Sequence, residues 1–125
     1  MASRKPINSL QQMTEVDKHA AWSAFVGLVR RRIRMYTLTG GLAEVAALFV
    51  GFDNGIGPGI LGAFQEWMSA RHDGHSEFVF LVLVVHELTG DHESWTFPLP
   101  SKVDADAALL LLDLLDQFLQ EQPTS

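Results

Sequence analysis

Apolar side chains recur at helical spacing in three stretches of the chain, a pattern that predicts amphipathic helices. The first stretch starts at Thr14 and Asp17, which resemble a capping box, and it ends in a run of arginines at Arg34. The second ends near Gly51 to Gly55, and the third follows that glycine-rich corner. The apolar positions are Trp22, Phe25, Val26, Val29 and Ile33; Leu42, Val45, Leu48, Phe49 and Phe52; and Ile60, Leu61, Phe64, Trp67 and Met68.

Two further elements complete the pattern. The run Phe78 to Val85 is β-branched and aromatic without alternation, so propensity favours a strand, but no partner strand is visible in the sequence. We therefore interpret it as a buried helix and keep a short strand at 78–85 as the alternative. Ser101 and Asp104 form a second S-x-x-D helix start, and leucines cover more than one face of the helix predicted over 105–121.

These elements predict one compact all-α domain of about five helices over residues 14–121, or an α+β domain if residues 78–85 form a strand. We expect residues 1–13 to be a flexible lead-in and residues 122–125 a frayed tail. The chain length of 125 residues fits a single domain, and an apolar share of 47% suffices for a core.

Net charge is −6, and it is unevenly divided along the chain. Residues 1–34 hold seven basic and two acidic residues for +5, whereas residues 35–125 hold two basic and thirteen acidic residues for −11. An acidic body argues against nucleic acid and anionic membranes as partners and favours a basic protein. The chain has no cysteine and no apolar leader, and its apolar runs are too short to span a bilayer, so we expect a cytoplasmic protein.

The spacing Gly57-x-Gly59-x-x-Gly62 has the letters of a dinucleotide-binding fingerprint. If residues 78–85 formed the next strand, the acid at its end would be Glu87. Glu87 lies 30 residues after Gly57, beyond the expected spacing of about 20 residues. Pro58 also removes a backbone N–H that a pyrophosphate would use. The segment is therefore interpreted as a glycine corner between two helices, with Pro58 near the first turn of the second.

Four histidines in two polar segments raise the alternative of a metal-dependent hydrolase. They are His72, His75, His86 and His92, and acidic residues lie among them. Their spacing matches no metal motif, because Gly90 stands where H-E-x-x-H requires its second histidine. We therefore expect no catalysis, no intrinsic metal and no cofactor.

Three short motifs carry a resemblance to a family. They are Arg32-Ile-Arg-Met35-Tyr36, the Gly51-Phe52-Asp53 helix end, and Gly62-Ala-Phe-Gln-Glu66-Trp67. Over residues 30–90 the chain resembles small bacterial immunity proteins encoded beside polymorphic toxins, which have an Arg-Pro-x-Met-Tyr turn and a Gly-Phe-x-Glu-Trp helix. Ile33 replaces the usual proline and Arg34 a frequent glycine, so the turn before Tyr36 could instead be continued helix.

The resemblance implies an immunity protein that binds and neutralises a cognate toxin, and the acidic composition favours a basic toxin as that partner. The predicted contacts are polar, mostly acidic residues of the glycine corner, the third helix and the segments after it. They are Asp53, Asn54, Glu66, Asp73, Glu77, Glu87, Asp91 and Glu93. A homodimer remains possible, and a homo-oligomeric scaffold built on the leucine-rich last helix is a third reading.

Overall fold

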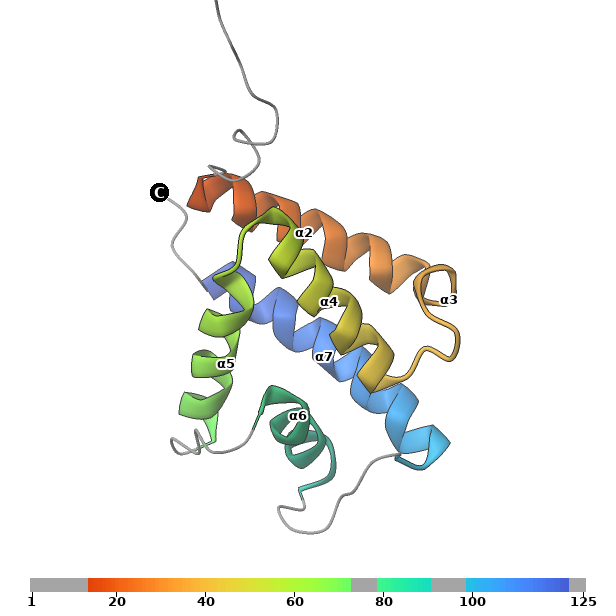
Figure 1. Cartoon of the computed structure of the whole chain (residues 1–125). Helices are drawn as coiled ribbons and strands as arrows, with labels where there is room; N and C mark the ends of the chain where they lie inside the picture. The colour runs from red at the N-terminus through yellow and green to blue at the C-terminus, as the bar shows by residue number, and fades with distance from the viewer. Residues whose placement is uncertain (1–13, 73–78, 91–98, 122–125) are drawn as a thin grey trace, which may run out of the picture.

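The computed structural model describes residues 14–72, 79–90 and 99–121 (Figure 1). Within these ranges the chain is all-α, with no strand, and forms a single compact domain, as the sequence predicts. The helices are α2 (Glu15–Arg31), α3 (Ile33–Tyr36), α4 (Leu42–Ile56), α5 (Ile60–Arg71), α6 (Phe80–Thr89) and α7 (Ser101–Glu121). The predicted lead-in at 1–13 and tail at 122–125 lie outside the described residues.

The last helix, α7, is the centre of the arrangement, because it packs against α2, α4, α5 and α6. Helices α2, α4 and α7 lie along one another, with α2 and α4 running in opposite directions (Figure 1). Helices α5 and α6 cross the end and the lower side of this group. Helix α3 is a single turn at the far end of α2, beside the start of α4.

Local signals explain where several helices begin and end. The Thr14 side chain accepts a hydrogen bond from the Asp17 backbone N–H at 3.0 Å, which is the N-cap that the sequence predicts for α2. Residues 80–89 form helix α6, so the buried-helix interpretation of this run is correct. Gly90 ends α6 in the left-handed conformation, with φ of 75° and its N–H bonded to the His86 carbonyl.

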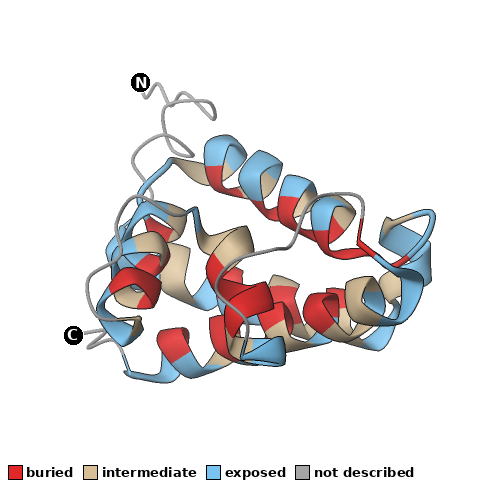
Figure 2. Cartoon of the chain, turned by 90° about the horizontal axis from the view of Figure 1, so that it is seen from below, coloured by how far each residue is buried: buried red, intermediate tan, exposed pale blue. Residues whose placement is uncertain are grey.

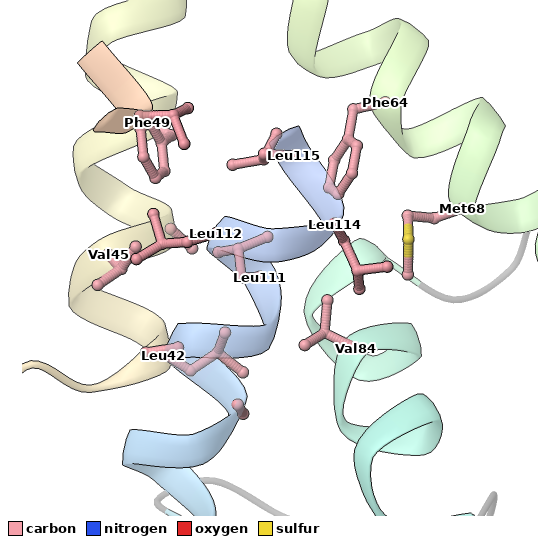
Figure 3. Close-up of a cluster of buried hydrophobic side chains, with 14 of the residues drawn as sticks. Leu42, Val45, Phe49, Phe64, Met68, Val84, Leu111, Leu112, Leu114 and Leu115 are labelled. Atoms are coloured by element: carbon pink, nitrogen blue, oxygen red, sulfur yellow. The ribbon is translucent and has the colours of Figure 1, made fainter. Parts of the chain in front are cut away.

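Buried side chains line the inward faces of the helices, while the outward faces are exposed (Figure 2). The leucines of α7 pack between two sets of partners, with Leu42, Val45 and Phe49 on α4 and with Phe64, Met68 and Val84 on α5 and α6 (Figure 3). The buried leucines of α7 are Leu111, Leu112, Leu114, Leu115 and Leu119. Their burial explains why leucine covers more than one face of this helix.

Aromatic rings form two clusters at opposite sides of α7. In the first, Trp22 stacks on Phe49 and meets Phe52 edge-on, with both centroid distances at 5.3 Å. In the second, Phe64 packs edge-on against Phe118 at 5.6 Å. Stacked and edge-on pairs add to the free energy gained by burial alone.

One predicted helix start is wrong in its details. Ser101 is the first residue of α7 and not its cap, and the Asp104 N–H bonds to the Pro100 carbonyl at 2.8 Å. The Asp104 carboxylate instead accepts the Leu42 N–H at 2.8 Å and so caps the start of α4. A residue late in the chain therefore fixes the beginning of an early helix.

Candidate functional site

The glycine corner between α4 and α5 is held from inside by Asp53. This residue is 6% exposed, and its carboxylate accepts the backbone N–H groups of Gly59 and Leu61, each at 3.4 Å. Gly57 and Gly59 have φ of 107° and 146°, a conformation that favours glycine. A helix, not a strand, precedes the corner, so the dinucleotide fingerprint lacks the strand that it requires.

The predicted partner contacts other than Glu87 divide into three groups. Asp53 is buried against the α5 N-terminus, so its carboxylate is not at the surface and we remove it from the predicted contacts. Asn54 and Glu66 are exposed on α4 and α5. Asp73, Glu77, Asp91 and Glu93 lie outside the described residues.

Glu87 on α6 takes part in an ion-paired cluster with the end of α5. The Arg71 guanidinium donates to both Glu87 carboxylate oxygens, at 2.7 and 3.3 Å, and His72 Nε2 lies 2.9 Å from Oε1. Burial raises the pKa of Glu87, but the hydrogen bonds from Arg71 and His72 outweigh it and leave the pKa below its usual value. Arg71 also lies over the Trp67 ring, 4.9 Å from its centroid.

This cluster predicts an acid-sensitive contribution to stability. A carboxyl whose pKa is lower in the folded state stabilises the fold above its unfolded pKa, and the contribution is lost as pH falls through the folded pKa. Glu87→Gln should therefore cost about 1 kcal/mol at neutral pH, with allowance for partial exposure, and the cost should shrink below about pH 4. Urea unfolding of both proteins across this pH range measures it.

Glu66→Gln is the matched control, since Glu66 is exposed and forms no ion pair among the described residues. Its unfolding free energy should follow that of the wild type at every pH. If the Glu87→Gln difference stayed constant down to pH values well below about 4, the ion pair would not be its source.

Two of the four histidines of the hydrolase hypothesis lie within the described residues, and they differ in burial and in their surroundings. His72 faces Glu87 at the end of α5, whereas His86 is buried on α6 at 5% exposure. Within residues 14–72, 79–90 and 99–121, no three histidine, aspartate or glutamate side chains are grouped closely enough to hold a metal ion. His75 and His92 lie outside these ranges.

The feature that sequence reasoning missed is a surface at α3. Helix α2 stops at Arg31, and Arg32, with φ of −139° and ψ of 50°, turns the chain before the four residues of α3. The turn brings large apolar side chains to the surface, with Met35 71%, Tyr36 39% and Leu38 82% exposed. In the motif Arg32 to Tyr36, Met35 is therefore not a core residue.

A hollow of about 530 Å³ opens at this surface. It is lined by Arg34, Met35, Tyr36, Thr37, Leu38, Glu44, Ala47 and Leu48. A smaller hollow of about 240 Å³ shares Arg34 and is lined also by Ile33, Thr39, Gly40, Ala105 and the exposed Leu109. We call the residues of both hollows, with the adjacent Arg32, the α3 surface.

Hydrogen bonds fix the loop that forms one wall of the larger hollow. Glu44 accepts from the Thr39 hydroxyl at 2.6 Å, from the Thr39 N–H at 2.7 Å and from the Leu38 N–H at 3.3 Å. The two bonds from Thr39 lower the pKa of Glu44 most, and the bond from Leu38 lowers it less. Together they hold this pKa below its usual value. The Thr37 hydroxyl donates to the Ile33 carbonyl at 2.9 Å and accepts from Gly40 N–H at 2.9 Å.

The arginines of the α2–α3 junction differ in their partners. Arg30 bridges to Asp113 at 2.6 Å and to Asp116 at 2.9 Å on α7. Among the described residues, Arg31, Arg32 and Arg34 form no ion pair, and all three are exposed. The sequence shows only a run of arginines, so contact with α7 is what separates Arg30 from the others.

Comparisons with known proteins identify no relative, so a function has to be inferred from the geometry of the chain. No family model matches the chain, and no curated protein or solved structure matches it. None of the described helices combines the length and the hydropathy needed to cross a bilayer. The candidate site is therefore the α3 surface, together with the exposed Asn54 and Glu66.

Proposed function

We propose that this chain is an immunity protein, an inhibitor that binds a bacterial protein toxin and blocks it. The observation that carries the proposal is the α3 surface, where exposed apolar side chains border the larger hollow. Exposed apolar patches with polar surroundings are characteristic of protein-binding sites. Met35 and Tyr36 belong to the motif that resembles immunity proteins, so the resemblance and the surface coincide.

The charge of the chain supports a basic toxin as the partner. A net charge of −6 raises the rate at which a basic protein approaches, even where individual acids contribute little to affinity. Glu66 and Asn54 remain proposed contacts because they are exposed. Asp73, Glu77, Asp91 and Glu93 also remain, and Glu87 would contribute only where a partner adds to its existing ion pairs.

The proposal involves binding alone, with no catalytic step, metal or cofactor, and it places the chain in the cytoplasm, where an immunity protein would meet its toxin. For the scaffold alternative, α7 has little apolar surface left in its second half. Leu114 is 3% exposed and Leu119 is 1% exposed, because both pack inside the monomer. Leu109 is the large apolar residue of α7 that is exposed, at 47%, and it lies in the α3 surface.

Co-expression with the toxin domain encoded beside this chain in its genome tests the proposal. Wild-type protein should restore growth of a bacterial host that makes the toxin, and the two purified proteins should form a stable complex. The triple variant with Asp73, Asp91 and Glu93 changed to Lys should associate more slowly, with the loss decreasing at high salt. Growth arrest despite abundant folded protein, with no complex, would overturn the proposal.

A further inference from the structure

We infer that the α3 surface receives an apolar side chain of the toxin that is flanked by carboxylates. The inference rests on the proposed function, because the segment is taken to belong to the neutralised protein. The inference specifies which chemical groups meet at the contact, and these groups cannot be deduced from the net charge of the chain. The local surface is basic and apolar, opposite in charge to the rest of the molecule.

Shape and apolar exposure indicate what enters the larger hollow. The larger hollow is a shallow, open depression of about 530 Å³, so it can receive a side chain presented by a protein surface. The apolar part of the lining comes from Met35, Tyr36, Leu38, Ala47 and Leu48. Burying Leu38, exposed at 82%, and Met35, exposed at 71%, would remove a large apolar area from water.

Charge indicates what flanks that side chain. Arg32 and Arg34 are exposed and form no ion pair among the described residues. Arg32 donates to the Met35 sulfur at 3.6 Å, a weak contact that a partner carboxylate would replace. Glu44 is the acid in the lining, and its carboxylate already accepts three hydrogen bonds from Leu38 and Thr39. Arginine binds carboxylates with paired, directed hydrogen bonds, so acidic residues beside the apolar anchor fit this rim.

The wall of the hollow is held in place before any partner arrives. Bonds from Thr37 to Ile33 and from Gly40 to Thr37 close the turn after α3, and Glu44 ties the same turn to α4. The Tyr36 ring is anchored edge-on against Phe25, with centroids 5.8 Å apart. A preformed surface loses less conformational entropy on binding than a loop that must become ordered.

Two other occupants are less consistent with these features. A nucleic acid would use the arginines, but a net charge of −6 repels it and Leu38 and Met35 offer it little. A second copy of the chain would have to present an acid together with an apolar side chain. Asp113 and Asp116 on α7 are bound to Arg30, and the exposed Glu66 lies on α5, which has no large exposed apolar residue. Both remain measurable outcomes of the experiment.

Peptide display on the wild-type protein tests the inference without the toxin. Random linear peptides are selected on the folded chain after depletion on Leu38→Glu. We expect enrichment of peptides that carry a leucine or an aromatic residue beside aspartate or glutamate. Binding of an enriched peptide should fall at least about tenfold in Arg34→Glu, and a peptide with lysines in place of its acids should regain affinity for that variant.

Val16→Glu is the control for folding and for apolar surface elsewhere, because Val16 is 51% exposed in the first turn of α2, remote from α3 along the helix. It should bind the peptide as the wild type does.

The inference fails if no acidic-apolar motif is enriched, if Arg34→Glu leaves binding unchanged, or if the surface instead binds single-stranded RNA. It also fails if light scattering shows a dimer that Leu38→Glu dissociates. The peptide experiment does not use the toxin, so its failure would not affect the growth-rescue experiment. Growth rescue therefore tests the proposed function independently.

Discussion

Trp22→Ala should destabilise the fold by about 3–5 kcal/mol, the largest effect that we expect from one substitution. Trp22 is fully buried, and its ring contacts Phe49 and Phe52 at 5.3 Å, so truncation leaves a cavity between α2 and α4. Both neighbouring rings are on α4, and a collapse that refills the space would require α4 to shift towards α2. Urea unfolding followed by circular dichroism measures the loss.

Val16→Ala is the control for this measurement, since Val16 lies on the same helix and is 51% exposed. Its unfolding free energy should stay within about 0.5 kcal/mol of the wild type. A cost for Trp22→Ala below about 1 kcal/mol would show that the ring cluster does not form the core described here.

Gly41→Ala should destabilise the fold by about 2 kcal/mol, because Gly41 is the N-cap of α4, where glycine is preferred to alanine, and because the added carbon meets Asp104. A Cβ at this position would lie 2.2 Å from the Asp104 carboxylate oxygen and 2.9 Å from its carbon, so the carboxylate must move. The displacement breaks the bond from Leu42 N–H that caps α4. The φ of Gly41 is −83°, which alanine adopts readily, so backbone strain does not contribute to the cost.

A double-mutant cycle and a second glycine isolate the cause. In an Asp104→Ala background, Gly41→Ala should cost much less, because the group that it displaces is gone. Gly62→Ala on α5 should stabilise the fold by up to about 1 kcal/mol, since nothing lies within 4 Å of the added carbon. Equal costs for Gly41→Ala in both backgrounds would contradict the proposed contact.

Helical periodicity was enough to predict most of the fold. The Thr14 cap, the apolar stripes of α2, α4 and α5, and the glycine corner all follow from residues close in sequence. Residues 80–89 needed a further argument, because their β-branched composition favours a strand. The lack of a partner strand decided it, and burial at Leu83, Val84 and Val85 shows how packing overrides propensity.

Interactions between distant residues were not predictable from the local pattern. Asp104 is 62 residues from Leu42, whose N–H it accepts, and a single sequence gives no indication of that pairing. From the sequence, Asp53 is expected to be an exposed acid at the glycine corner. In the fold, the α5 N-terminus covers it, and its carboxylate accepts the Leu61 N–H. The α3 surface depends on where α2 stops, and the local sequence allows continued helix through Arg32. Its one visible signal was Leu38, a large apolar residue in a polar turn.

The most direct test of the account is toxin protection by Leu38→Glu. This side chain is 82% exposed beside the larger hollow, so the substitution should leave the melting temperature unchanged while placing a charge where we propose that the toxin's apolar side chain binds. The account predicts that a host making the toxin grows with the wild type and with Val16→Glu, but not with Leu38→Glu at equal abundance. Growth with Leu38→Glu at the wild-type rate would contradict the assignment of toxin binding to the α3 surface.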